Sequence, residues 1–80
     1  MEKAELLKII GKRIQEIRNS KEYSQVDLAG KIEGVFDTTN VSRIESGRTN
    51  PTIYTLHRIA EALEVSLSEL LNIEDCETNI

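Results

Sequence analysis

The sequence predicts an all-α fold, and three observations support this prediction. Apolar residues recur at helical spacing near the N-terminus, where Leu7, Ile10, Ile14 and Ile17 follow one another three, four and three residues apart. Helix-capping residues flanked by apolar residues occur at four further places along the chain. No segment alternates apolar and polar residues as a half-buried strand would. We therefore expect helices joined by short connections.

Five helices are expected, the first over residues 3–19. The other four begin after the predicted N-caps Ser24, Asp37, Thr52 and Ser66. An apolar residue precedes each cap and another lies at the fourth helical position, which is the pattern of a hydrophobic staple. Glu69, three residues after its cap, is expected to complete a capping box. Gly34 and Gly47 favour the left-handed turns that end helices.

The composition limits the class of protein. Eighty residues suffice for one domain, and 39% hydrophobic with 30% charged residues is typical of a soluble globular chain. No apolar run approaches the length of a membrane span, and the charged N-terminus does not resemble a secretion signal. The single cysteine, Cys76, cannot form an internal disulfide, which fits a reducing cytoplasm. We expect a cytoplasmic protein with no membrane partner.

The distribution of charge matters more than its sum. The net charge of −4 argues at first against a polyanionic partner. However, residues 1–50 contain nine Lys and Arg against eight Asp and Glu, whereas residues 51–80 contain one Arg against six acids. The acid is concentrated near the C-terminus, so the charge of the N-terminal part is compatible with a DNA-binding surface there.

Two short helices in the middle of the chain, expected over residues 25–32 and 38–46, carry the functional signal. Val41 and Ile44 share the inner side of the second helix, while its outer side carries only short polar side chains and one arginine. Short Thr, Ser and Asn side chains and an arginine suit contact with base edges in a DNA major groove. The alternative is an ordinary solvated helix face, since every helix at a protein surface has a polar side.

The stretches YSQVDLAGKI and VSRIESGRTNPTIYTLHRIAEALEVSLSELL resemble the Cro/repressor-type helix-turn-helix family, also called XRE, over about residues 9–71. The resemblance implies a compact five-helix, lambda-repressor-like domain over residues 1–72, followed by an acidic tail over residues 73–80. Its second and third helices would form the helix-turn-helix. It implies a sequence-specific transcriptional regulator, more often a repressor, that binds double-stranded DNA as a homodimer on a near-palindromic site.

The resemblance also assigns residues. The third helix would face bases through Thr38, Thr39, Asn40, Ser42 and Arg43. Gln25 would contact a phosphate or a nearby base, and Arg48, Asn50 and the amides of residues 52–54 would contact phosphates. Arg18 and Glu45 would form a buried ion pair, against the alternative of two exposed charges.

Two departures from the family pattern stand out. The connection between Ile32 and Val41 is about two residues longer than usual, which predicts a different angle or depth of docking for the third helix. Gly30, inside the second helix, costs about 1 kcal/mol relative to alanine.

The remaining residues leave two alternatives open. Leu67, Leu71 and Ile73 exceed the needs of a small core and indicate either a dimer interface or ordinary core with a loose tail. With one histidine, His57, and one cysteine, neither a metal site nor a cofactor site is expected, and no nucleophile–base pair indicates an enzyme. The alternative function is a protein-interaction module, such as an antitoxin or a co-regulator with a toxin or protein partner, that uses the same fold without reading bases.

Overall fold

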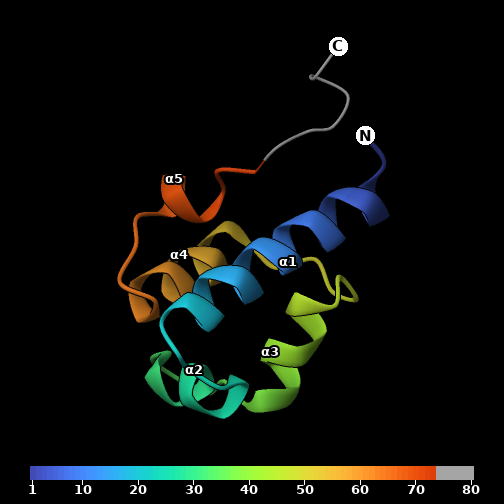
Figure 1. Cartoon of the computed structure of the whole chain (residues 1–80). Helices are drawn as coiled ribbons and strands as arrows, with labels where there is room; N and C mark the ends of the chain where they lie inside the picture. The colour runs from blue at the N-terminus through green and yellow to red at the C-terminus, as the bar shows by residue number, and fades with distance from the viewer. Residues whose placement is uncertain (74–80) are drawn as a thin grey trace.

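Five helices make up the described part of the chain in the computed structural model, residues 1–73 (Figure 1). They are α1 (Lys3–Ser20), α2 (Gln25–Lys31), α3 (Thr38–Glu45), α4 (Ile53–Ala62) and α5 (Leu67–Leu70). Residues 1–73 contain no strand, which confirms the all-α prediction. Within that range no helix combines the length and the hydropathy needed to cross a membrane. Cys76 and the predicted tail beyond Ile73 lie outside the described residues.

The four predicted caps are present. The side chains of Ser24, Asp37, Thr52 and Ser66 each accept a hydrogen bond from the backbone N–H three residues later, at 2.9–3.1 Å. The capping box predicted at Glu69 is wrong, because within residues 1–73 its side chain returns no bond to the Ser66 backbone. The reciprocal box forms instead at Ser24, whose N–H donates to Asp27 at 2.9 Å. Asp has a shorter side chain than Glu, so it loses less rotamer entropy when it accepts the bond from the N–H of the cap residue.

Three helices end in the same left-handed turn. After α3, Gly47 has φ +77°, and the N–H groups of Gly47 and Arg48 donate to the carbonyls of Ile44 and Arg43. This is a Schellman motif. The same pattern ends α1 and α4, with Glu22 (φ 62°) and Glu64 (φ 61°) in the glycine position.

The expectation that Gly34 ends the second helix is wrong. α2 stops at Lys31, and Ile32 is already extended because its side chain turns into the core. Gly34 has φ +90° but lies inside the connection from α2 to α3.

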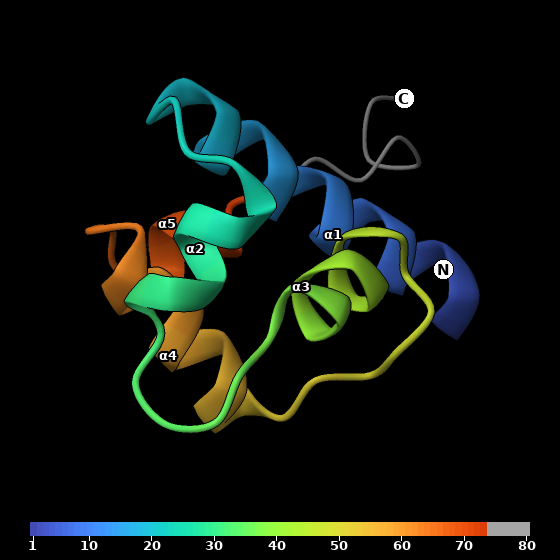
Figure 2. The same ribbon diagram turned by 90° about the horizontal axis from the view of Figure 1, so that it is seen from below.

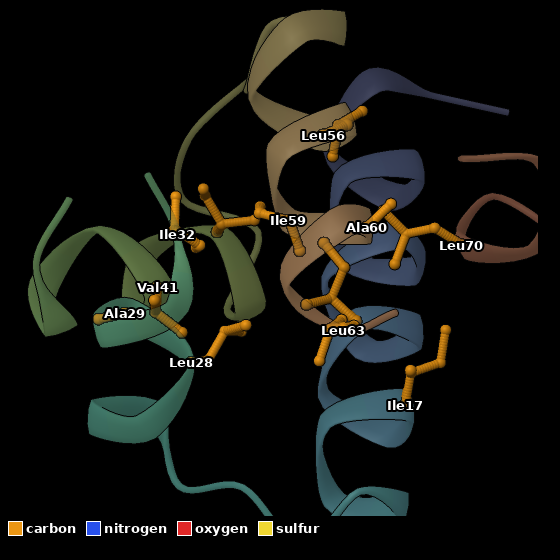
Figure 3. Close-up of a cluster of buried hydrophobic side chains, with 12 residues drawn as sticks. Ile17, Leu28, Ala29, Ile32, Val41, Leu56, Ile59, Ala60, Leu63 and Leu70 are labelled. Carbon is orange, nitrogen blue, oxygen red and sulfur yellow. The ribbon is translucent and has the colours of Figure 1, made fainter. Parts of the chain in front are cut away.

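One hydrophobic core joins the helices (Figure 3). α4 contributes Leu56, Ile59 and Ala60, and Leu63 follows at its C-terminal end. Figure 1 shows α1 crossing the molecule, with α2 and α3 on one side of it and α5 on the other. The remaining core residues come from the other helices and their ends: Ile14, Ile17, Leu28, Ala29, Ile32, Val41, Ile44 and Leu70. Each large side chain buried in this way contributes roughly 1.5–3 kcal/mol to folding.

Candidate nucleic-acid interface

Helix α3 has one buried and one exposed side. Val41 and Ile44 are 2% and 4% exposed and face the core. Thr39, Ser42 and Arg43 on the opposite side are exposed, with Thr38 and Asn40 half-buried on its flanks. The structure thus places the five side chains assigned to base contact on and beside the outer face of one helix. We call these five residues the reading face.

The N-terminal end of α3 supplies further hydrogen-bond donors. Asp37 Oδ1 accepts from the N–H of Asn40 at 2.9 Å, which satisfies one of the first-turn groups. The N–H groups of Thr38 and Thr39 have no carbonyl four residues earlier within the helix, as in any first helical turn. An anionic group approaching this end would meet both donors and the positive end of the helix dipole.

Arg18 and Glu45 fix α3 to α1. Arg18 Nε donates to Glu45 Oε2 at 2.7 Å and Arg18 Nη2 donates to Glu45 Oε1 at 3.0 Å, which is a two-bond fork. Arg18 Nη1 also donates to the carbonyl of Tyr23 at 2.7 Å. The two charged residues are 7% and 8% exposed. Glu45 lies on the core side of α3, so the pair fixes the direction in which the opposite side points.

Gln25 lies at the first turn of α2, and its side chain turns inward. Its Nε2 donates to Glu45 Oε1 at 3.0 Å. The residue therefore joins the ion pair and connects α2 to α3. A contact between Gln25 and DNA would have to use the carbonyl end of the same amide or follow a rotation of the side chain.

Gly11 is a residue whose importance the sequence reasoning missed. It is buried in the middle of α1, where α1 packs against the end of α3. A Cβ at Gly11 would lie 2.4 Å from the carbonyl oxygens of both Ile44 and Glu45. Since those atoms belong to the backbone, only glycine allows this close approach. A glycine inside an otherwise strong helical pattern was the signal that could have found it.

The connection from α3 to α4 carries the residues assigned to phosphate contact. Arg48 and Asn50 are both exposed there. Thr52 caps α4 through the N–H of Thr55 at 3.1 Å, so the N–H groups of the first α4 residues point out of the same loop. An open hollow of about 300 Å³ separates α3 from α4, with Asn40, Arg43, Thr49 and Thr55 among its lining residues.

The apolar residues near the end of the described chain are partly used by the core. Leu67 and Leu71 are half-buried and pack against it, and Ile73 is half-buried as well.

Residues 1–73 contain no group of three or more His, Cys, Asp or Glu side chains that could hold a metal ion. His57 lies 3.5 Å from Glu61 on the exposed side of α4.

Comparisons with known proteins agree with this geometry. Residues 14–70 match the helix-turn-helix family. The chain is 32% identical over 71 residues to an HTH-type transcriptional regulator, y4dJ, of Sinorhizobium fredii, a match that covers 89% of this chain and 90% of that protein. It is 34% identical over 65 residues to the immunity repressor of Bacillus phage phi105, covering 81% of this chain and 44% of the repressor. The crystal structure of the restriction-modification controller protein C.AhdI from Aeromonas hydrophila superposes with a TM-score of 0.76 at 32% identity, covering 85% of this chain and 94% of that one.

Proposed function

This chain belongs to the helix-turn-helix family of DNA-binding transcriptional regulators, and from that premise we propose that it represses transcription as a homodimer on a near-palindromic site. The proposal rests on one observation, which is that the two sides of α3 differ. The inner side is fixed by core packing and by Glu45, and the outer side is an exposed row of short polar side chains.

Base reading is assigned to the reading face. Arg43 is exposed, and no acid lies within ion-pair distance of it in residues 1–73, so its guanidinium is free to make two hydrogen bonds to a guanine. Thr39 and Ser42 are short enough to let the helix approach base edges closely. Each supplies a hydroxyl, and Thr39 also offers a methyl group to a thymine.

Phosphate contact is assigned to Arg48, Asn50 and the backbone amides at the start of α4. These groups lie on an exposed loop that directly follows α3, so they would meet the sugar–phosphate backbone beside the groove in which α3 sits. Such contacts fix the register of the protein on the duplex without carrying sequence information. Gln25 would add a contact from α2 through the carbonyl end of its amide, because its amide nitrogen donates to Glu45.

Homodimerisation is assigned to α5 and its flanks, with Leu67, Leu71 and Ile73 as the contact residues. All three retain exposed surface after packing in the monomer. A two-fold axis near α5 would place two α3 helices on one side of a duplex, about 34–36 Å apart, or one helical turn. Repression would follow if the dimer occupied a site that overlaps a promoter.

The experiment that tests the proposal is a binding selection from random duplex DNA at moderate salt, followed by sequencing of the enriched pool. A two-fold motif with half-sites one turn apart is the expected result. A folded protein that enriches no motif would contradict base reading by this chain. A single half-site motif would retain base reading and overturn the dimer.

The second candidate is a protein-interaction module that does not read bases. The net charge of −4 and the six acids of residues 51–80 favour it. Salt separates the two candidates, because binding through phosphates weakens steeply as salt rises, whereas an apolar protein contact does not. We place it second because the reading face of α3 presents no acid.

A further inference from the structure

The connection between α2 and α3, residues 32–37, has few attachments of its own. Ile32 is 4% exposed and Phe36 packs against the core, so both ends are anchored. Between them Val35 is fully exposed. Among the hydrogen bonds of residues 1–73, residues 33–36 take part in only one, and its donor comes from α4. In Figure 2 this connection, drawn in green, crosses α4 on its way from α2 to α3.

The donor is Arg58. Its Nη2 donates to the carbonyl of Glu33. The Arg58 guanidinium carbon lies 5.7 Å from the centre of the Phe36 ring and 5.8 Å from that of Tyr54, both within the range of cation–π attraction. One α4 side chain therefore contacts the connection near its beginning and near its end.

Gly34 completes this contact. Its φ of +90° bends the connection, and a Cβ there would lie 2.9 Å from Arg58 Nη2. The backbone at Gly34 therefore passes close to the guanidinium. Arg58 has no acid within ion-pair distance in residues 1–73, so its contacts with the connection are not shared with a salt bridge.

The position of the connection determines where α3 begins. Phe36 is the apolar residue before the Asp37 cap, and α3 starts at the next residue, Thr38. A displacement of residues 33–36 would therefore pass directly into the first turn of α3. That turn carries Thr38 and Thr39, whereas Arg43 lies in the last turn, next to the part of α3 that Glu45 fixes.

We propose that Arg58 is a positioning residue for base recognition, which holds the 32–37 connection against α4 and so fixes the N-terminal end of α3 relative to the DNA. The inference rests on the proposed function. This contact would give a connection that has few attachments of its own a fixed position against α4. Arg58 acts through Thr38 and Thr39 and does not itself touch a base.

The test uses Arg58→Met, which keeps most of the aliphatic stem and removes the donor and the charge. Affinities are measured for the selected site and for every single base-pair variant of it, at several salt concentrations. We expect discrimination at the base pairs facing Thr38 and Thr39 to fall about fivefold or more, the scale of one good base contact. Discrimination at the base pair facing Arg43 and the slope of log affinity against log salt should stay unchanged.

Two results would overturn the inference. If Arg58→Met discriminates as the wild type does, Arg58 has no positioning role. If affinity falls equally for all sequences and the salt slope decreases by about one phosphate contact, Arg58 binds the DNA backbone instead. A wild type that selects no motif would be a failure of the proposed function itself, and this outcome is recognised before any variant is made.

Two further variants keep the test independent of folding. Ile17→Val shortens a core side chain of α1 away from the connection, and it should lower stability without changing base discrimination. Gly34→Ala strains the connection itself, because its φ of +90° disfavours a Cβ, and it should reproduce the loss seen with Arg58→Met. If Ile17→Val alters discrimination in the same way, the effect is one of general stability and the inference is wrong.

Discussion

Arg18 and Glu45 form a buried, two-bond ion pair that joins the end of α1 to the end of α3, with N–O distances of 2.7 and 3.0 Å. Gln25 donates to the same carboxylate from α2. One acidic side chain therefore connects three helices, including both helices of the helix-turn-helix. The pair lies on the side of α3 away from the reading face, so it orients that face without occupying it.

Removing one partner of this pair should destabilise the fold strongly. Glu45→Leu leaves the guanidinium of Arg18 buried without its carboxylate, which typically costs about 3–5 kcal/mol. The double variant Arg18→Met with Glu45→Leu removes both charges and should recover a large part of that loss. Urea unfolding of the three proteins measures the difference. If the loss of unfolding free energy in the double variant equals the sum of the losses in the two single variants, the two residues are not coupled.

Two glycines inside helices provide a matched pair of predictions. Gly11→Ala should destabilise the protein by about 1–3 kcal/mol, because its Cβ would meet two backbone carbonyls at 2.4 Å and would force α1 and α3 apart. Gly30→Ala meets nothing within 4 Å and should stabilise it by about 0.5–1 kcal/mol. Thermal or urea unfolding distinguishes them. If both substitutions stabilise, the close contact between α1 and α3 is not as tight as described.

Glu64 occupies a left-handed position that favours glycine. Glu64 lies just after the end of α4 and has a φ of 61°. The N–H of Val65, the next residue, donates to the carbonyl of Ala60. Glu64→Gly should therefore raise the free energy of unfolding by up to about 1 kcal/mol. Glu61→Gly, inside α4, serves as the control and should lower it by about 1 kcal/mol. A destabilised Glu64→Gly protein would contradict the assigned turn.

The cap of α2 predicts a dependence of stability on acid. Hydrogen bonds from the backbone N–H and the hydroxyl of Ser24 hold the pKa of Asp27 below its ordinary value of 3.8. The ionised form is favoured in the fold, so its contribution is complete above that value and is lost as the pH falls through the lowered pKa. Asp27→Asn removes the titrating group. The stability difference between wild type and variant should shrink as the pH falls below 3.8, as measured by urea unfolding.

The helix starts were predictable from sequence because each depends on neighbouring residues. A cap such as Thr52 and the backbone N–H that it satisfies lie three residues apart, so local spacing contains the whole interaction. The outer face of α3 was predictable for the same reason, since helical periodicity places Thr39, Ser42 and Arg43 together.

Contacts between distant segments were less predictable. Gly11 meets residues more than thirty positions later, and nothing in the local pattern of α1 identifies that partner. The Gln25 side chain turns inward because it donates to Glu45, which lies on another helix. The DNA contact that the resemblance implied for Gln25 therefore gave no indication of this internal bond. Likewise, the contact of Arg58 with Glu33 arises only when α4 packs beside the connection.

The measurement that tests the central claim most directly compares Arg43→Ala with Arg48→Ala on the selected site and its single base-pair variants, over a range of salt. Both residues are exposed arginines outside the core, so neither change should unfold the protein. If α3 reads bases, Arg43→Ala loses about 1–3 kcal/mol at one or two base positions and relaxes the preference there. Arg48→Ala should weaken binding to all sequences alike and reduce the salt slope by about one. Equal, sequence-independent losses for both variants would contradict base reading by α3.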